Sequence, residues 1–226
     1  MFDSAASSYI RTNKVITFGQ DQRWRQAAAD IIEARSDNDK ILDICTGTAD
    51  LALKIAKKFP RLKIYALDYS PNMLAVAKKR ADACGLHNII FKEGDFSNME
   101  FENGSFDYVT ISFGFRNLSF YQENLKKTLR QIHRILKPGG RFIIIETSHP
   151  PNRFLRGIFH FYAARIIPIL GGMLSGEHVP YAYLGSSILK FFNRDELIDV
   201  VESAGLREEK LKPFMFGAIL LCVFQK

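Results

Sequence analysis

The sequence predicts an α/β fold built on a mostly parallel β-sheet. Short runs of β-branched and apolar residues alternate with longer segments of helical period, and no internal repeat or low-complexity tract interrupts them. Of the 226 residues, 47% are hydrophobic, which is ample for a sizeable core, and the length fits one generous domain better than two small ones. We therefore expect residues 1–226 to form one domain, with helices crossing over between successive strands.

The expected strands are the short apolar runs, and the expected helices lie between them. The strands are Ile41–Cys45, Lys63–Asp68, Ile89–Glu93, Asp107–Ser112 and Arg141–Thr147, with two more near Glu209–Pro213 and Ala218–Phe224. The helices are Asp50–Phe59, Pro71–Cys84, Gln122–Leu136 and Asn193–Leu206. Pro71 suits a first helical turn. The KPGG stretch, Lys137–Gly140, predicts a turn because its residues cannot continue a helix.

Two segments stand outside this alternation. Residues 1–35 are expected to form a helical cover, and residues 148–190 a lid-like insertion over one end of the sheet. The insertion contains RFLRGIFHFYAARIIPILGGML, whose few charges suit a lid over a greasy acceptor or a surface that touches membrane lipid. Ordinary core packing against the sheet is the alternative. Arg165, Pro168 and the Gly171–Gly172 pair argue against a membrane-spanning helix.

The charge and the cysteine content bear on whether the protein binds nucleic acid or metal and on the compartment in which it works. The net charge of +7 favours an anionic partner, but the basic residues are scattered over helix faces without a basic-aromatic platform, so no nucleic acid is expected. Cys45, Cys84 and Cys222 have neither disulfide-framework nor zinc-site spacing, so we expect no metal and a reducing cytoplasm. The N-terminus lacks the apolar core of a signal peptide, which predicts a soluble protein. No feature indicates an oligomeric state.

Acidic residues mark the ends of the first three expected strands. LDICTGTAD, Leu42–Asp50, turns from strand to helix with a single glycine, unlike the glycine-rich loops that bind dinucleotides or triphosphates. Asp68 ends the second strand, where an acid commonly binds a ribose diol, and Asp95 follows the third, near the expected place of an adenine ring. Each acid alone has a helix cap or turn as its alternative role. Together they are the pattern of a class I S-adenosylmethionine-dependent methyltransferase.

Over nearly its whole length the chain resembles the C-methyltransferases of ubiquinone and menaquinone biosynthesis. The matching stretches are FDSAASSY, TFGQDQRWR, LDICTGTADLA, LDYSPNML, GDF, FENGSFDYVTISFGFRN, RILKPGGRFIIIETSHP, YAYLGSSI and FFNRDELIDVVESAGL. SFGFRN, Ser112–Asn117, is the most specific, because the general methyltransferase fold does not require it. The resemblance implies a Rossmann-like class I methyltransferase sheet, mostly parallel with an antiparallel last strand, helices on both faces and a helical lid insertion.

The resemblance also implies the site residues. Those at the S-adenosylmethionine site are Asp43, Gly47, Thr48, Asp68, Asp95, Phe96 and Ser112, of which Asp43 and Gly47 shape the turn. Arg116 and Asn117 would face the acceptor ring, and Tyr9 would close over it. The acceptor would be a hydrophobic small molecule, S-adenosylhomocysteine the second product, and the insertion a place of peripheral membrane contact.

Four positions depart from the family pattern: Ile10, Ala49, Thr147 and Ser186. Ala49 replaces a usual glycine, so its turn must suit a Cβ or accept a small cost. The other three replace an acid, a phenylalanine and a glutamate, and they cluster on the acceptor side. They therefore bear on the substrate assignment more than on the cofactor assignment.

The expected chemistry is an in-line methyl transfer, for which the protein supplies alignment and a negative acceptor. Removing a proton from a phenolic hydroxyl puts carbanion character on the neighbouring ring carbon, and Arg116 and Asn117 would stabilise the oxyanion. Tyr9 and His149 are the candidate general bases. Two rival functions stay open: a methyltransferase for another small acceptor or RNA, and a nucleotide-binding module without transferase chemistry.

Overall fold

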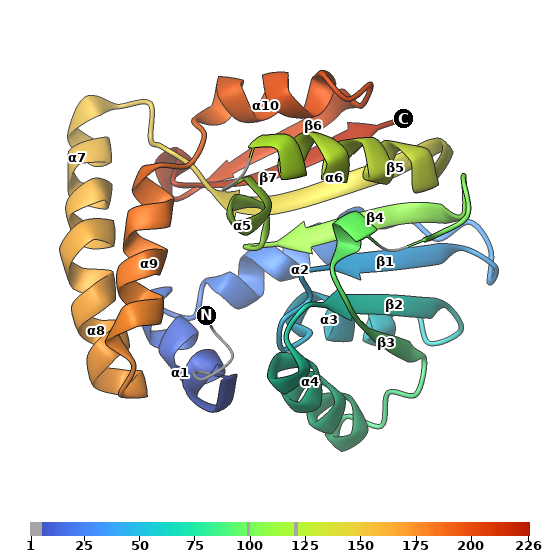
Figure 1. Cartoon of the computed structure of the whole chain (residues 1–226), viewed down its shortest axis with the longest axis horizontal. Helices are drawn as coiled ribbons and strands as arrows, with labels where there is room; N and C mark the ends of the chain where they lie inside the picture. Colours follow the sequence, from blue (N-terminus) through green and yellow to red (C-terminus); the bar gives the residue numbers. More distant parts are fainter. Residues whose placement is uncertain (1–5, 99, 120–121) are drawn as a thin grey trace.

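The computed structural model describes residues 6–98, 100–119 and 122–226, and these contain one seven-stranded sheet (Figure 1). The strands are β1 (Lys40–Ile44), β2 (Lys63–Asp68), β3 (Ile89–Glu93), β4 (Phe106–Ser112), β5 (Leu136–Thr147), β6 (Arg207–Phe214) and β7 (Ile219–Gln225). Their order is β3-β2-β1-β4-β5-β7-β6. β1 to β5 pair in parallel, whereas β7 runs antiparallel to both β5 and β6. This confirms the predicted mostly parallel sheet with an antiparallel last strand.

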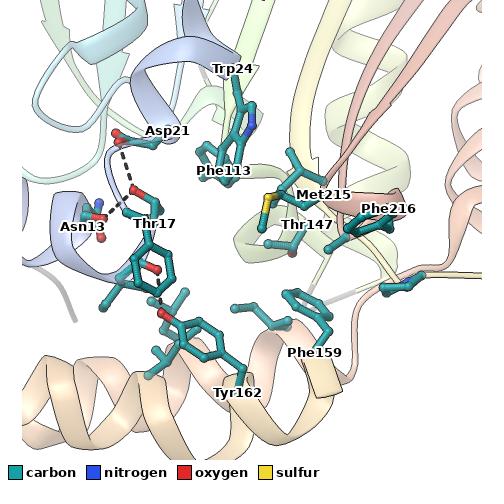
Figure 2. Close-up of a pocket in the computed structure, with 18 of the residues that line it drawn as sticks. Asn13, Thr17, Asp21, Trp24, Phe113, Thr147, Phe159, Tyr162, Met215 and Phe216 are labelled. Atoms are coloured by element: carbon teal, nitrogen blue, oxygen red, sulfur yellow. Dashed lines mark hydrogen bonds between the residues drawn. The ribbon is translucent and has the colours of Figure 1, made fainter. Parts of the chain in front are cut away.

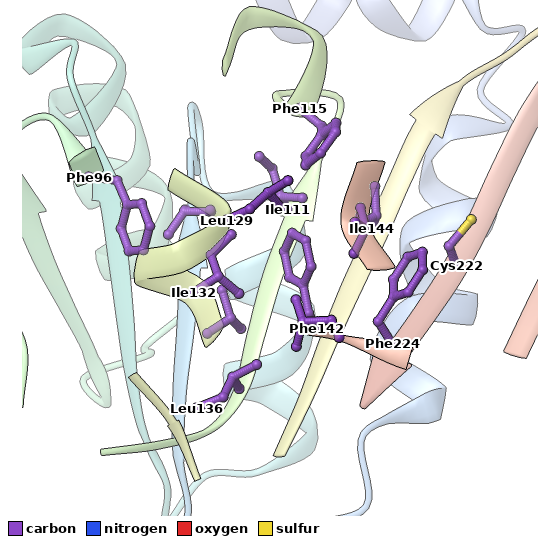
Figure 3. Packing of buried hydrophobic residues seen from close by; sticks show 14 of the residues in the cluster. Phe96, Ile111, Phe115, Leu129, Ile132, Leu136, Phe142, Ile144, Cys222 and Phe224 are labelled. Carbon is purple, nitrogen blue, oxygen red and sulfur yellow. The ribbon is translucent and has the colours of Figure 1, made fainter. Parts of the chain in front are cut away.

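Helices cover both faces of the sheet, as predicted. On one face lie α2 (Asp21–Ile31), α3 (Asp50–Lys58) and α4 (Pro71–Ala83), and on the other α5 (Phe115–Ser119), α6 (Gln122–Ile135) and α10 (Arg194–Glu202). Each face buries its own apolar cluster; in the second, α6 contributes Leu129 and Ile132 against Phe142 of β5 (Figure 3). Ser70 caps α4 by accepting from the Met73 N–H at 3.1 Å, with Pro71 in the first turn.

The KPGG stretch lies inside β5 and not in a turn before it. β5 begins at Leu136, which pairs with Phe106, and the next pair is Arg141 with Tyr108, so Lys137–Gly140 form an irregularity in the strand. Gly139 has a φ of +75° there. Its N–H donates to the Lys226 carbonyl at 3.0 Å. The glycines thus serve a bulge that holds the C-terminal residue, which is why no turn forms before the strand.

The N-terminal helix and the insertion share a small core of their own, beside the sheet. α1 (Ala6–Ile16) lies beside α8 (Ile167–Ser175) and α9 (His178–Leu189) of the insertion, as Figure 1 shows. The insertion begins with a third helix, α7 (Arg153–Phe161). Ile16 packs with Ile167 and Tyr181, and the Tyr162 hydroxyl donates to the Ile16 carbonyl at 2.6 Å. The inner side of the insertion therefore packs on the N-terminal cover and not chiefly against the sheet.

α7 and α8 are joined by the π-helical turn η2 (Tyr162–Ile166) into one helix, Arg153–Ser175. Among the described residues it is the one helix long and apolar enough to cross a membrane by length and composition, with 23 residues and a mean hydropathy of 1.4. Pro168 and the glycine pair, which argued against a membrane-spanning helix, do not interrupt it. The wider π turn precedes Pro168 and accommodates its missing N–H. The glycines give α9 room, since a Cβ at Gly171 would lie 2.1 Å from Tyr181 Cγ.

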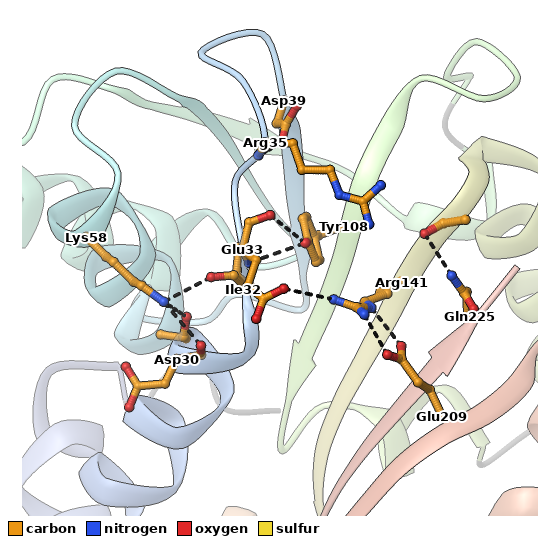
Figure 4. Close-up of polar contacts among 12 residues, drawn as sticks. Asp30, Ile32, Glu33, Arg35, Asp39, Lys58, Tyr108, Arg141, Glu209 and Gln225 are labelled. Atoms are coloured by element: carbon orange, nitrogen blue, oxygen red, sulfur yellow. Dashed lines mark hydrogen bonds and ion pairs between the residues drawn. The ribbon is translucent and has the colours of Figure 1, made fainter.

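Polar contacts fix α2 and the segment after it to the sheet (Figure 4). Lys58 of α3 donates to the carbonyls of Ala29 and Ile32 at 2.9 Å each. The Tyr108 hydroxyl of β4 donates to the Glu33 carbonyl at 2.9 Å. Both contacts hold the C-terminal end of α2 and the residues that follow it, against α3 and near the start of β4.

Candidate active site

A polar cavity of about 660 Å³ opens at the carboxyl ends of β1 to β4. Six of the seven residues predicted at the cofactor line it together: Asp43, Gly47, Thr48, Asp68, Asp95 and Ser112. The seventh, Phe96, points its side chain into the core, 3% exposed and stacked near Phe101. Because its neighbours Asp95 and Ser97 line the cavity, any contact of Phe96 with a ligand there would come from its main chain.

The β1–α3 turn owes its shape to three left-handed residues, Cys45, Gly47 and Ala49, with φ of +52°, +56° and +62°. A Cβ at Gly47 would meet nothing within 4 Å, so glycine there serves the backbone and keeps the cavity open. Ala49 accepts the small cost that its departure from glycine implied, about 1–2 kcal/mol for a left-handed non-glycine residue.

Asp68 ties the first two strand ends together. Its Oδ2 accepts from the Gly47 N–H at 2.7 Å, and its Oδ1 accepts from the Ser70 N–H at 2.9 Å. The helix-cap alternative does not describe this geometry, because the cap of α4 is Ser70. Asp68 therefore orders the edge of the cavity from which a carboxylate would meet a ribose diol.

Asp43 lies beneath the turn, 1% exposed, and receives a hydroxyl on each oxygen. Thr110 Oγ1 donates to Oδ1 and Thr46 Oγ1 to Oδ2, both at 2.6 Å. Burial raises the pKa of Asp43 to about 6, with the charge of Asp68 adding to this, while the two hydroxyls and Arg25 act in the opposite direction. The carboxyl group thus shapes the turn from below, as the resemblance implied.

Asp95 and Ser112 complete the polar cavity. Asp95 accepts from the N–H and Oγ of Ser97 at 2.9 and 2.8 Å, so it also holds the short turn η1 (Phe96–Asn98). The Ser112 hydroxyl is buried without a hydrogen-bond partner among the described residues. Such an orphaned group at a cavity wall fits a polar ligand. The cavity thus offers two carboxylates at strand ends, an open glycine turn and the unpartnered hydroxyl of Ser112. These groups suit a ligand that has an adenosyl group and an amino-acid end.

A second, apolar cavity of about 380 Å³ lies between the N-terminal helices, the insertion and the end of β7 (Figure 2). Its walls are aromatic and aliphatic and include Trp24, Phe159 and Tyr162. Phe18 and Phe216, which are 75% and 76% exposed, lie at its rim. Among the described residues its charged lining is limited to Asp21, Arg25 and Arg116.

The two cavities meet at Tyr9, Arg25 and Phe113, which line both. Tyr9, which the resemblance placed over the acceptor ring, therefore lies where the two cavities join. Burial raises the pKa of the Tyr9 phenol, although Arg25 and the Asn13 side chain act in the opposite direction, so the hydroxyl stays protonated at neutral pH. The Arg25 guanidinium lies 5.1 Å from the centre of the Phe113 ring and pairs with Asp21.

Comparison with known proteins identifies the family of the chain. The model of the ubiE/COQ5 methyltransferase family matches residues 1–226. The chain belongs to this family. A demethylmenaquinone methyltransferase of Geobacillus stearothermophilus is 37% identical over 96% of this chain and 91% of that protein. One of Thermus thermophilus is 38% identical over 91% of this chain and 90% of its own length. The predicted resemblance is confirmed.

Solved structures share the fold of this methyltransferase. A SAM-dependent methyltransferase from Aquifex aeolicus superposes with a TM-score of 0.60 at 18% identity, covering 85% of this chain and 84% of that one. A putative methyltransferase of Haloferax volcanii, solved with the activator Trm112, covers 100% of this chain and 97% of its own with a TM-score of 0.69 at 19% identity. The Rossmann-like methyltransferase fold is thereby confirmed.

The structure separates Arg116 and Asn117, which the resemblance placed together at the acceptor. Arg116 lines the apolar cavity, whereas Asn117 lines the polar one, where the Tyr183 hydroxyl donates to its Oδ1 at 3.5 Å. Adjacent positions at the start of the short helix α5 turn their side chains to different sides. In the methyltransferase, Arg116 is therefore the one of the two that lines the apolar cavity.

Glu146 is a buried partner of Arg116 that sequence reasoning missed. It is fully buried, and its Oε1 accepts from Arg116 Nη1 at 2.6 Å and from the Thr147 N–H at 2.8 Å. The sequence signal for this pair is the acidic residue at the end of the apolar strand RFIIIE. An acid buried with such a strand requires a charged or hydrogen-bonding partner. The Asp21–Arg25 pair, at helical spacing in DQRWR, was missed for want of any sign that it faced a cavity.

His149, a candidate base, is not among the residues that line either cavity. Its Nε2 lies 2.8 Å from the Phe191 carbonyl, and its Nδ1 lies 2.9 Å from His160 Nε2. Both ring nitrogens are therefore engaged within the protein. The histidine fastens the start of the insertion to the segment after α9.

Proposed function

We propose that this chain transfers a methyl group from S-adenosylmethionine to a ring carbon of a demethylated quinol that carries a hydrophobic tail. The observation that carries the proposal is the meeting of a polar strand-end cavity with an apolar cavity at Tyr9, Arg25 and Phe113. The names of the Geobacillus and Thermus relatives support a demethylmenaquinol as the acceptor. The apolar cavity also favours it over RNA, which needs a basic surface.

Bound S-adenosylmethionine supplies a methyl carbon made electrophilic by its sulfonium. Asp68 and Asp95 would accept hydrogen bonds from its sugar and base ends, and Ser112 would offer its unpartnered hydroxyl. Phe113 and Tyr9 would set the acceptor ring against this group and exclude water from the contact. Arg116 would stabilise the negative oxygen of the acceptor.

The insertion would act as the lid of the acceptor cavity and as its contact with lipid. Leu155, Ile158 and Phe159 line the cavity from α7, while the same helix exposes Phe154 and Phe161, at 74% and 62%. A quinol with a long tail partitions into the bilayer, so exposed apolar side chains beside the cavity would help an enzyme to take the quinol from the bilayer.

The double variant Phe154→Ser with Phe161→Ser should reduce sedimentation with liposomes and leave the affinity for S-adenosylhomocysteine unchanged. Unchanged sedimentation would contradict the lipid contact.

The test of the proposed function is transfer of labelled methyl groups to a panel of acceptors. The panel contains short-chain demethylated naphthoquinols and benzoquinols, a catechol without a tail, and a structured RNA. We expect rapid methylation of a tailed quinol and none of the RNA. Methylation of RNA alone, or no turnover of any quinol by a protein that binds S-adenosylmethionine, would refute the proposal.

The cofactor half is tested separately by calorimetry. Wild-type protein should bind S-adenosylmethionine and not NAD, and Asp68→Ala should weaken that binding at least about tenfold, since charge-assisted hydrogen bonds contribute roughly 1.5–3 kcal/mol each. An intact Asp68→Ala protein with unchanged affinity would show that Asp68 only fixes the turn through Gly47 and Ser70.

A further inference from the structure

The apolar cavity contains one carboxylate among the residues that the structure describes, that of Asp21. Asp21 begins α2, is 4% exposed and lies beside Thr17 at the wall of a mostly apolar cavity (Figure 2). A buried acid in a greasy cavity is unfavourable unless it is paired, and an acid at such a place is a candidate for proton transfer. The hydrogen-bond partners of the two Asp21 carboxylate oxygens show which oxygen is paired with a cation and which is available for proton transfer.

The two oxygens of Asp21 have different partners. Oδ2 accepts from Arg25 Nη1 and from Gln22 Nε2, the latter at 3.0 Å. Oδ1 lies 3.0 Å from Thr17 Oγ1. Gln22 Nε2 also lies 3.4 Å from Asp50 Oδ1 of the polar cavity, so the same amide connects Asp21 to the cofactor side. Arg25 and Gln22 thus hold one oxygen, and the other faces a hydroxyl.

The Thr17 hydroxyl can serve both protonation states of Asp21. It lies 2.7 Å from the Asn13 carbonyl, which can only accept, so that carbonyl takes the hydroxyl proton (Figure 2). The lone pairs of Thr17 Oγ1 then face Asp21 Oδ1 and can accept a proton from it. When Asp21 is ionised, the hydroxyl can turn and donate to it instead. A carboxyl group arranged in this way can gain and lose a proton without leaving a buried group unsatisfied.

Other candidate bases are less suitable. Tyr9 keeps its own proton because burial raises its pKa. His149 lies outside both cavities with its two nitrogens engaged. Glu146 accepts from Arg116 and from Thr147 and does not line the cavity.

We propose that Asp21 is the general base of the methyl transfer, an assignment that rests on the proposed function. Asp21 Oδ1 takes the proton of the acceptor's phenolic hydroxyl. The ring carbon beside the oxygen then bonds to the methyl carbon as the methyl–sulfur bond breaks, with that bond's electron pair left on sulfur. The ring carbon loses its hydrogen as a proton to water, which restores an aromatic phenolate, and the phenolate recovers its proton from Asp21. The net release is one proton.

The charges of the cavity are consistent with this transfer. Moving the proton shifts one negative charge from Asp21 to the acceptor oxygen, within a cavity that both Arg25 and Arg116 line. The total charge does not change, and either guanidinium can stabilise the anion. Arg25 keeps its position near Asp21 through its contact with the Phe113 ring.

Asp21→Asn is the informative variant, because an amide can still accept from Arg25 and donate to Thr17. Its kcat should fall by about 10²–10⁴, the scale of general acid–base catalysis. Its affinity for S-adenosylhomocysteine should stay within about twofold of the wild type, as for a change that leaves cofactor contacts intact.

The matched control is Asp39→Asn. Asp39 is 7% exposed and lies outside both cavities, so this variant should keep wild-type turnover. Wild-type turnover in Asp21→Asn would overturn the assignment.

A series of acceptors with increasingly acidic hydroxyls distinguishes a base from a positioning residue. The ratio of wild-type to Asp21→Asn turnover should shrink along the series and approach one for a quinol analogue that is already ionised in solution. A ratio that stays large and constant would make Asp21 a positioning residue and overturn the proposal. A wild-type protein that methylates no quinol would overturn the proposed function as well, whereas equal turnover of both proteins on a quinol that is not ionised in solution would overturn the base alone.

Discussion

Arg116 and Glu146 form a buried ion pair beside the apolar cavity, at 6% and 0% side-chain exposure. The carboxylate also accepts from the Arg116 main-chain N–H at 3.2 Å, so one side chain fixes both ends of the arginine. Removing one partner of a buried pair leaves an uncompensated charge, which costs roughly 3–5 kcal/mol. A simple arginine deletion therefore changes stability and catalysis together.

The double variant Arg116→Ala with Glu146→Gln separates the two effects. Arg116→Ala alone should lower the free energy of unfolding by about 3–5 kcal/mol and kcat by about 10²–10³, the scale for losing one oxyanion donor. Adding Glu146→Gln should recover much of the stability but none of the turnover. Urea unfolding and quinol methylation measure the two quantities. Recovery of turnover in the double variant would remove Arg116 from the acceptor site.

The strand-end acids could be predicted from sequence because their positions follow from the fold. Once β1 to β3 are recognised as parallel strands, Asp43, Asp68 and Asp95 must share one edge. Glu146 could not be paired in the same way, because its partner stands 30 residues earlier and the link exists only in three dimensions. For Phe96 the sequence predicts the position of the backbone correctly, beside the cavity, but not the direction of the side chain. Core packing determines that direction.

Among the elements, the β4–α5 turn approaches the β1–α3 turn at Gly114. A Cβ at this position would lie 2.5 Å from Cys45 Cβ, closer than real contacts allow. Cys45 has little freedom to retreat, because its φ of +52° is already strained for a non-glycine residue. The glycine of SFGFRN thus allows two strand ends to share the cofactor cavity.

Gly114→Ala should push these turns apart and weaken S-adenosylhomocysteine binding by about tenfold or more. Overpacking of this kind typically costs 1–3 kcal/mol in stability. Calorimetry and thermal unfolding are the measurements. Gly157→Ala in α7, where a Cβ meets nothing within 4 Å, is the matched control and should raise stability by up to about 1 kcal/mol through helix propensity. Unchanged affinity in Gly114→Ala would mean that the turns adjust freely.

The insertion should respond to the acceptor if it is a lid. Backbone amides of Ile158–Met173 should exchange faster in the free enzyme and become protected when a quinol analogue fills the apolar cavity. Hydrogen exchange read by mass spectrometry tests this, with S-adenosylhomocysteine alone as the control that should change little. Strong protection that is equal with and without the analogue would identify a static helix layer.

Helix continuity and strand irregularity were the elements that sequence could not predict. Local rules end a helix at Pro168 and before KPGG, and α6 does end before KPGG, at Ile135. The same rules do not predict that a helix continues through Pro168 or that KPGG itself belongs to a strand. In the structure a π turn accommodates the first and a bulge against Lys226 the second. Both outcomes depend on neighbours distant in the chain, so tertiary packing overrides the local rule.

At the scale of the whole molecule, Asp43 makes stability depend on pH. Its pKa rises from 3.8 to about 6 on folding, so its contribution is fully present below pH 3.8 and is lost as pH rises through 6. The difference corresponds to roughly 3 kcal/mol. Relative to wild type, Asp43→Asn should therefore gain about that much stability between pH 4 and pH 7. Urea unfolding at both values tests this, and a constant difference would contradict the raised pKa.

The exposed residues that line the two cavities are different ones: Phe18 and Phe216 line the apolar cavity, and Tyr69 and Asp95 line the polar cavity. We therefore expect the two cavities to open to solvent at different places, which bears on the order in which ligands can bind. Neither ligand has to pass through the place of the other, so the kinetic mechanism should be random sequential, with intersecting initial-rate lines. Each product should then compete only with the substrate of its own cavity. Parallel lines, or an acceptor that cannot bind before the methyl donor, would show that one opening controls the other.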